Sequence, residues 1–292
     1  MTLDTFALQL LTGLSRAAVL FIVASGLSLV FGALRIVNVA HGSFYMLGAF
    51  LAVTLSAFVG GPLGFVAALI AVPLLVAAIG AAVERIALRS LYDKEHLLQL
   101  LATFALLLVF HDLVRAVWGE RPHRLVAPDI LRGPADMFGV IFPRYNLFLI
   151  AAAVVLAVAL WALMTRTGFG RDIRAAVSDP EMLGMVGVNV PRLFTLVFAV
   201  GAGLGALGGI LASPRGTVLL GMDVDIIIQA FAVVIIGGLG SLLGTAIGAL
   251  LVGITFAFGV LLVPQAAMAM VFLVMVAVLV FRPYGLFGIP ER

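Results

Sequence analysis

The stretch Gly26-Leu-Ser-Leu-Val-Phe-Gly-Ala-Leu-Arg-Ile-Val-Asn-Val-Ala-His-Gly-Ser-Phe-Tyr-Met-Leu-Gly-Ala49 decides the fold class. It joins two long apolar runs through a short polar interruption that contains Arg35, Asn38 and His41. An apolar run of about 20 residues is long enough to cross a bilayer as a helix. The stretch therefore predicts two membrane-spanning helices with an irregular backbone segment between them.

The same apolar character extends over the whole chain of 292 residues, of which 64% are hydrophobic and 11% are charged. A soluble domain is about half apolar and about a quarter charged, so a soluble core of this length would have too apolar a surface. The chain has no cysteine, which excludes a disulfide framework, a Cys-based metal site and a catalytic thiol. A formal net charge of +3 gives no reason to expect a nucleic-acid partner. The composition predicts an integral membrane protein.

We expect an all-α, polytopic transmembrane helical bundle that forms a single transmembrane domain over residues 1–292. The number of spans is eight or nine, because residues 226–262 are about twice the length that one span needs. A Gly-Gly-Leu-Gly-Ser break near the middle of that run allows two spans, or one span plus a re-entrant piece. The apolar runs lie at 8–33, 43–59, 63–83, 97–118, 147–164, 193–213, 226–262 and 266–281.

The orientation follows from the distribution of Lys and Arg, which favour cytoplasmic segments. Segments 84–96 and 165–192 and the C-terminal tail are basic and are predicted to be cytoplasmic. Segment 119–146 also holds four arginines, but one span separates it from each of the first two segments, so it lies on the periplasmic side. Its four prolines predict an irregular loop. Residues 1–15 contain no Lys or Arg, so they lack the basic region of a cleavable signal peptide, and the N-terminus is predicted to be periplasmic.

Two glycine-broken segments, Val37–Ser43 and Ile235–Ser241, resemble each other, and a Gly-Ala pair follows each. The likeness predicts an internal repeat of two halves. Interrupted segments in corresponding positions of two halves point to a translocation site, whereas glycines elsewhere let helices pack closely. Close packing is expected of Gly201, Gly203, Gly205, Gly208 and Gly209. The candidate pathway residues are Asn38, His41, Gly42, Ser43, Gly237, Gly238, Gly240 and Ser241.

Asn38 and His41 admit two interpretations. They form a polar turn at the membrane surface that caps the next helix, or they line a solute path. A metal site is not expected, because the chain has four histidines and no two of them share ligand spacing on one helix.

The spans lack the carboxylates on which ion-coupled transporters rely. All acidic residues except Asp112 fall in loops, tails or span ends, and Asp112 is expected to pair with Arg115. The chain has no phosphate-binding loop and no channel filter motif, and the spans hold no Ser/His/Asp constellation. These observations disfavour a self-sufficient secondary transporter and an intramembrane enzyme. Energy for uphill transport would come from another subunit, and no cofactor is expected on this chain.

The segment 165–192 contains a short helix over about 178–187. Its N-terminus is marked either by Ser178 with Glu181, which form a capping box, or by Asp179 followed by Pro180. Gly187 is the expected C-cap. The side chains of Met182, Leu183 and Val186 are expected on one apolar face, which packs either on its own bundle or on a cytosolic partner.

This segment resembles the cytoplasmic coupling loop of ABC-importer permeases, in particular the branched-chain amino acid permease family of the LivH type. The stretch 26–49 is similar to the N-A-H-G-x-x-x-M-L-G-A region of that family. The run 235–244 resembles its second Gly-rich segment, and 282–288 resembles its R-P-x-G-L-F-G ending. One departure is that Leu183 and Gly184 stand where relatives commonly have alanine.

The resemblance implies a multi-pass permease subunit of the bacterial inner membrane that works by alternating access. Its partners would be a second homologous permease, two cytosolic ATPase subunits that bind the ATP, a periplasmic substrate-binding protein and the lipid bilayer. The solutes would be leucine, isoleucine, valine or related compounds. The implied ATPase-coupling residues are Gly170, Arg171, Arg174, Ser178, Asp179, Glu181, Met182, Leu183, Val186 and Gly187.

Overall fold

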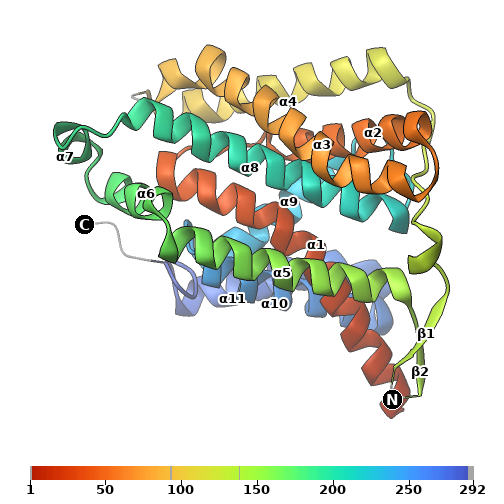
Figure 1. The fold of residues 1–292 in the computed structure, drawn as a ribbon. Helices are drawn as coiled ribbons and strands as arrows, with labels where there is room; N and C mark the ends of the chain where they lie inside the picture. Colours follow the sequence, from red (N-terminus) through yellow and green to blue (C-terminus); the bar gives the residue numbers. More distant parts are fainter. Residues whose placement is uncertain (1, 93, 138, 289–292) are drawn as a thin grey trace.

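The computed structural model describes residues 2–92, 94–137 and 139–288, and most of them lie in long helices that run alongside one another (Figure 1). Eight helical segments of this part of the chain are long and apolar enough to cross a membrane. The predicted all-α, polytopic bundle is therefore confirmed, and the predicted runs match the helices closely. The helices are α1 (Leu3–Leu34), α2 (His41–Val59), α3 (Gly61–Val83), α4 (His96–Trp118), α5 (Arg144–Arg166), α8 (Val190–Ala212), α10 (Leu242–Leu262) and α11 (Ala267–Phe281).

The long apolar run at 226–262 folds as two helices. Helix α9 (Met222–Gly237) ends at Gly238, and α10 begins after Ser241. With 16 residues, α9 is about 24 Å long, somewhat short of a full span. It begins four residues before the apolar run, because Asp223 and Asp225 occupy its first turn, where acidic side chains interact favourably with the helix dipole.

Helix α1 forms the centre of the bundle. In its most apolar part 89% of the residues are buried, against 17% for α5 and 11% for the segment that contains α11. Its neighbours approach closely where glycines leave room. A Cβ on Gly201 of α8 would overlap Val30, and a Cβ on Gly253 of α10 would lie 2.6 Å from the Gly13 carbonyl oxygen. The close-packing function predicted for the α8 glycines is confirmed at Gly201, Gly205, Gly208 and Gly209, and Gly203 lies against Pro73.

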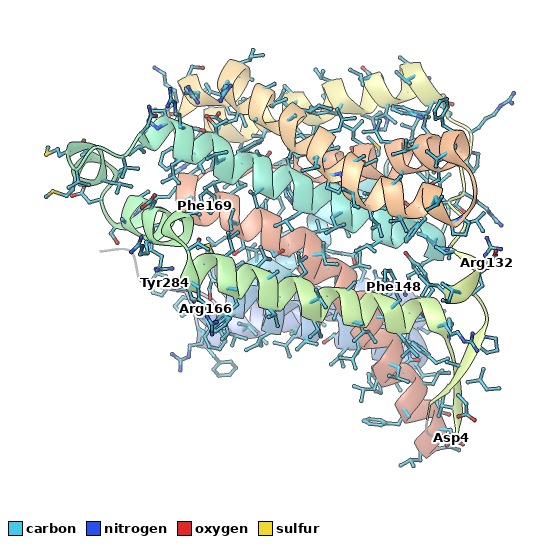
Figure 2. The ribbon with its side chains drawn as sticks, viewed as in Figure 1. Asp4, Arg132, Phe148, Arg166, Phe169 and Tyr284 are labelled. Carbon is cyan, nitrogen blue, oxygen red and sulfur yellow. The ribbon has the colours of Figure 1, made fainter. Side chains whose placement is uncertain are left out.

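The two ends of the bundle differ. Strands β1 (Pro134–Met137) and β2 (Val140–Pro143) form a hairpin near one end, which we call the hairpin end (Figure 1). The short helices α6 (Gly168–Ser178) and α7 (Pro180–Met185) project from the other, the α6–α7 end. Figure 2 shows Asp4 and Arg132 toward the hairpin end and Arg166, Phe169 and Tyr284 toward the α6–α7 end.

The hairpin corrects the expectation that 119–146 is irregular throughout. A 3₁₀ turn, η3 (Asp129–Leu131), precedes the strands, and an isolated bridge joins His123 to Val218. Alternating burial is visible over only four residues of β2, where Phe142 is buried and Ile141 is exposed. An alternation over four residues is too short to recognise in a sequence segment that contains prolines, and here Pro134 and Pro143 form the outermost pair of the two strands.

Helix α3 continues through a π turn, η1 (Glu84–Leu88), and a 3₁₀ turn, η2 (Arg89–Leu91). Two more 3₁₀ turns, η4 (Ser213–Arg215) and η5 (Pro264–Ala266), lie after α8 and before α11. The triplets α1–α2–α3 and α9–α10–α11 each consist of a helix, an irregular break, a second helix, a short turn and a third helix. This shared order agrees with the predicted repeat, which remains a prediction.

We predict that Gly209→Ala destabilises the protein by about 1–3 kcal/mol, because overpacking a tight core has costs of this order. A Cβ at Gly209 would overlap the carbonyl oxygen of Tyr45 on α2. Gly184→Ala is the matched control, since a Cβ on this helical glycine meets no atom within 4 Å. Thermal unfolding of the two variants in detergent checks the prediction, and equal melting temperatures would contradict it.

Candidate functional site

The broken segment between α1 and α2 runs back into the bundle. Arg35 ends α1 in the left-handed conformation, with φ 53°, and the chain then returns alongside α1 in an irregular path. The His41 Nε2 atom lies 3.0 Å from the carbonyl oxygen of Val23. Val23 precedes Arg35 by 12 residues, which is about 18 Å along a helix. Helix α2 therefore begins deep inside the bundle, where its irregular lead-in is enclosed by protein as membrane depth requires.

Asn38 and His41 are both fully buried. The expectation that they form a capping turn at the surface is wrong, because Ala40 is the N-cap of α2 and no side chain caps this helix. The amide atoms of Asn38 have no hydrogen-bond partner among the described protein groups. Thr103 of α4 donates instead to the backbone carbonyl of Val37 at 3.2 Å. The second interpretation, polar lining of a solute path, remains a prediction for Asn38 and His41.

A buried carboxylate that sequence reasoning missed faces this segment. Asp223, in the first turn of α9, is fully buried, and its Oδ2 accepts a hydrogen bond from Ser43 at 3.4 Å. A Cβ on Gly42 would overlap the Asp223 backbone carbonyl oxygen. Asp223 lies at a helix end, as expected of every acidic residue except Asp112, but its complete burial was not expected.

The expected pairing of Asp112 with Arg115 is also wrong. Arg115 pairs with Glu120, just beyond the end of α4, and Asp112 is exposed on the helix surface. The spacing of three residues along a helix allowed the pair Asp112–Arg115. The Glu120 carboxylate, beyond the end of the helix, is however the one that reaches the Arg115 guanidinium.

The Gly237–Ser241 break has a packing function. The backbone N–H groups of Leu286 and Phe287 donate to the carbonyls of Ile236 and Gly237, each at 2.9 Å. These bonds satisfy carbonyls that a helix end leaves without partners. The α9 C-cap, Gly238, has a φ of 101°, and a Cβ there would overlap Gly288.

The second half of the same break supports α10 and α1. Ser241 Oγ accepts from the Gly244 N–H at 3.1 Å and caps α10. A Cβ on Gly240 would lie 2.9 Å from the Gly32 Cα of α1. The structure thus does not bring the two broken segments together, because Gly42 contacts the first turn of α9 and Gly238 ends it. Pathway functions for Gly237, Gly238, Gly240 and Ser241 stay predictions.

The coupling segment forms two helices rather than one. Thr167 caps α6, and Ser178 is its last residue, so Ser178 does not cap the next helix. Asp179 Oδ1 accepts from the Met182 N–H at 2.9 Å, which confirms the alternative of Asp179 followed by Pro180. The C-cap of α7 is Val186 rather than the expected Gly187, which follows it with a φ of 91°. Gly170 packs against the carbonyl of Met164, to which Arg174 also donates a hydrogen bond.

The apolar face of α7 differs from the predicted one. The exposed fractions of Met182, Met185 and Val186 are 58%, 81% and 71%, whereas Leu183 is 7% exposed. Leu183 belongs to the core and anchors α7 to the bundle. The expectation that Leu183 shares an outward face with Met182 and Val186 is therefore wrong, and Met185 takes its place. Arg171, Arg174, Ser178, Asp179 and Glu181 are also exposed at this end.

A buried ionic network fixes the start of α8 to the end of α3. The fully buried Glu84 accepts hydrogen bonds at Oε1 from Arg89 Nε at 3.2 Å and Tyr92 at 2.6 Å. At Oε2 it accepts from Arg89 Nη2 at 3.2 Å and from the Thr195 hydroxyl at 2.6 Å. Burial, followed by the hydrogen bond to Glu84, raises the pKa of Tyr92, so its hydroxyl stays a proton donor to the carboxylate.

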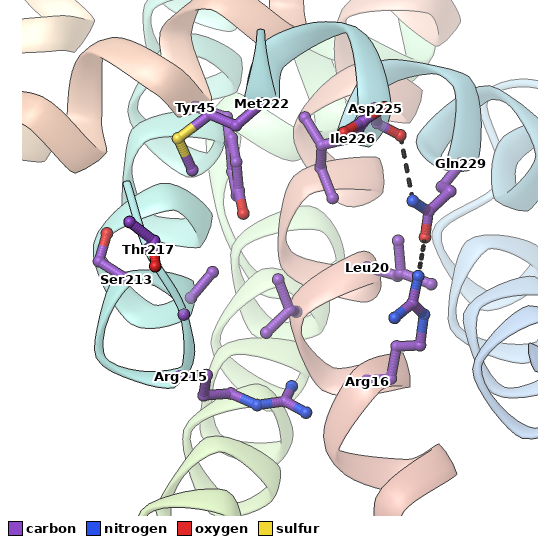
Figure 3. Close-up of a pocket in the computed structure, with 13 residues that line it drawn as sticks. Arg16, Leu20, Tyr45, Ser213, Arg215, Thr217, Met222, Asp225, Ile226 and Gln229 are labelled. Carbon is purple, nitrogen blue, oxygen red and sulfur yellow. Dashed lines mark hydrogen bonds between the residues drawn. The ribbon is translucent and has the colours of Figure 1, made fainter. Parts of the chain in front are cut away.

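A cavity of about 340 Å³ lies between α1, α2, α9 and the segment after α8 (Figure 3). Arg16 of α1 and Arg215 of η4 line it together with Asp225, Gln229 and apolar side chains. Arg16 Nη2 donates to Gln229 Oε1 at 2.7 Å, and the Arg16 guanidinium carbon lies 3.5 Å above the centre of the Phe256 ring. Sequence reasoning missed this site, because its residues come from separate segments and carry no local motif.

The fold and these features define a multi-pass membrane transport protein. The chain belongs to the family described as branched-chain amino acid transport system, permease component, which matches residues 9–280. Membership confirms the predicted resemblance to branched-chain amino acid permeases of the LivH type.

Curated relatives agree with the family. The chain is similar to the high-affinity branched-chain amino acid transport system permease protein BraD of Pseudomonas aeruginosa, with 30% identity over 97% of this chain and 96% of the relative. It is 25% identical to LivH of Escherichia coli K12 over 98% of this chain and 96% of LivH. A fructose import permease of Rhizobium meliloti, FrcC, matches 36% of the chain and 31% of its own length at 32% identity. No solved structure matches the chain.

We predict that Glu84→Gln destabilises the protein by about 1–3 kcal/mol, because the amide turns an N–H₂ group toward buried donors. Asp129→Asn is the matched control. This substitution removes the carboxylate that pairs with Arg132. The Asp129 side chain is 78% exposed, and such surface pairs contribute about 0–1 kcal/mol to stability. Thermal unfolding measures both, and a smaller loss in Glu84→Gln than in Asp129→Asn would show that the network is not stabilising.

Proposed function

We propose that this chain is the transmembrane permease subunit of an ATP-driven importer for branched-chain or related amino acids, and that it moves solute by alternating access. Family membership supports the class of transporter. The printed functions of BraD and LivH, which align over nearly their full lengths, support the solute class. The chain itself catalyses no reaction and binds no cofactor in this proposal.

The complete transporter contains a second homologous permease, two ATPase subunits that bind the ATP, and a periplasmic binding protein. In this arrangement the chain spans the bacterial inner membrane with its N-terminus and hairpin in the periplasm. The α6–α7 end faces the cytoplasm, in agreement with the basic residues Arg166, Arg171 and Arg174 that gather there.

The observation that carries the proposal is the projecting helix α7, with its exposed apolar side chains. Figure 1 shows α7 beyond the ends of the long helices. Exposed apolar surface of this kind, next to the charged Glu181 of the same helix, is typical of a protein–protein contact. We assign Met182, Met185 and Val186 to the ATPase contact and Leu183 to the anchor on the bundle.

The route from this contact into the bundle is short. Gly187 follows α7, and Asn189 caps α8 through a 3.0 Å hydrogen bond from the Arg192 N–H to its Oδ1. Thr195, one turn further on, joins the Glu84 network. A displacement of α7 therefore acts on α8, which packs on α1, α2 and α3.

We predict that Met185→Asp weakens copurification of the ATPase subunits by at least about tenfold, because it places a charge in an apolar contact. The membrane domain should stay folded, since Met185 is exposed. A charge at Val155 would face lipid, so Val155→Asp is not a suitable control. Thr5→Asp serves as the control, because Thr5 lies near the N-terminus at the opposite end of the bundle. Full copurification of the ATPase with Met185→Asp would refute the docking assignment.

One observation favours a second candidate function, a self-sufficient secondary transporter. Asp223 is a buried carboxylate beside the broken segment, and such groups carry protons in ion-coupled transporters. In the importer proposal the carboxylate has a structural function, as the acceptor for Ser43.

We predict that uptake by vesicles containing the complete transporter requires internal ATP and survives collapse of the pH gradient and the membrane potential. We further expect that Asp223→Asn lowers yield or stability without abolishing the ATP dependence. Uptake is measured with radiolabelled leucine, with and without ATP and a protonophore. Uptake that persists without ATP and stops on adding the protonophore would favour the secondary transporter.

A further inference from the structure

The cavity at Arg16 and Arg215 has an unusual charge arrangement for the interior of a membrane bundle. Both guanidinium groups line one cavity, yet neither takes part in an ion pair with a carboxylate of the described residues. Two like charges in a partly buried site repel each other and lose hydration, and such groups inside membrane proteins mark sites for charged ligands. The lining also contains the carboxylate of Asp225, which forms no ion pair with either arginine, so the cavity keeps a net positive charge and a place for one further anionic group.

Each arginine is held in position by groups that leave its charge uncompensated. Arg16 donates to the neutral amide of Gln229 and lies on the Phe256 ring, while its Nε is buried without a hydrogen-bond partner among the described protein groups. Gln229 is in turn fixed by a 3.1 Å hydrogen bond from its Nε2 to the Asp225 carbonyl oxygen. Arg215 donates to the Ser15 carbonyl at 3.3 Å. Figure 3 shows the Arg215 side chain extending toward α1, which carries Arg16.

The rest of the lining matches the other parts of an amino acid. Asp225 is exposed to the cavity and has no ion pair with the described cations, so its carboxylate is available to an ammonium group. Leu20, Met222 and Ile226 supply apolar surface. The volume of about 340 Å³ lies at the small end of the range for ligand sites, which suits a small solute.

We propose that this cavity is a binding site for the solute as a zwitterion, with its carboxylate on Arg16 and Arg215, its ammonium on Asp225 and its aliphatic side chain against Leu20 and Ile226. The inference rests on the proposed function, since it takes the solute to be an amino acid. Gln229 is a positioning residue that orients Arg16. In the proposed orientation the cavity is the site on the periplasmic half of the path.

The test uses the complete transporter, with its ATPases, second permease and binding protein, in vesicles of neutral lipid. Arg16→Gln, Arg215→Gln and Asp225→Asn should each lower ATP-dependent leucine uptake by at least about tenfold, as expected from losing a charge-assisted hydrogen bond. Arg16→Lys, which keeps the charge but loses the planar fork, should retain more uptake than Arg16→Gln. The matched control, Arg121→Gln, removes an exposed arginine at the same end and should leave uptake unchanged.

Three measurements separate this proposal from other sources of the anion. Complex yield and the affinity of the binding protein for the complex should be the same in the variants as in the unaltered protein. A lower yield of the complex would indicate that the arginines pair with a carboxylate of the second permease. A lower affinity of the binding protein for the complex would indicate that they pair with a carboxylate of the binding protein. An effect seen only in vesicles with anionic lipid would assign the site to a lipid headgroup. Each of these results overturns the proposal, as does full uptake in Arg16→Gln and Arg215→Gln. The absence of ATP-dependent uptake in the unaltered transporter would instead refute the proposed function itself.

Discussion

The irregular backbone of residues 36–40 lies at a depth where the lipid around the bundle cannot form hydrogen bonds with it. The rest of the structure encloses this segment. Lipid offers no partners for free N–H and C=O groups, so irregular backbone at this depth must be covered by protein. Helix α1 lies along one side of the segment, α4 provides Thr103 for the carbonyl of Val37, and α8 approaches His41 at Gly205. The glycines of α8 follow from this requirement, because larger side chains would hold α8 away from α1 and α2.

The helices and their order could be predicted from the sequence, because a run of about 20 apolar residues has one stable form in a bilayer. The packing function of the α8 glycines and the cap at Asp179 were predictable for a similar reason, since both depend on neighbours along one helix. Leu183, Asp223 and Arg16 were not predictable. The inward direction of Leu183, the burial of Asp223 and the cavity around Arg16 depend on contacts between segments far apart in the chain, which leave no local pattern.

Helix α8 connects the two regions for which functions are proposed, the coupling helices and the cavity. Its first turns carry Thr195 and adjoin the coupling helices, and the chain directly after it carries Arg215 in the wall of the cavity. With 23 residues it is about 35 Å long, and it is packed along much of this length against α1, α2 and α3. In the proposed mechanism, a displacement at the α6–α7 end acts on Arg215 through this closely packed helix.

The hydrogen bonds from Leu286 and Phe287 to the end of α9 also bear on how the protein is made. The N–H groups that satisfy the carbonyls of Ile236 and Gly237 are encoded about 50 residues later in the chain. During synthesis the C-terminal end of α9 is therefore incomplete while α10 and α11 enter the bilayer. Its carbonyls depend on other partners, such as water at the membrane surface, until the segment around Gly285 leaves the ribosome. Closure of this corner of the bundle thus follows translation of both α10 and α11.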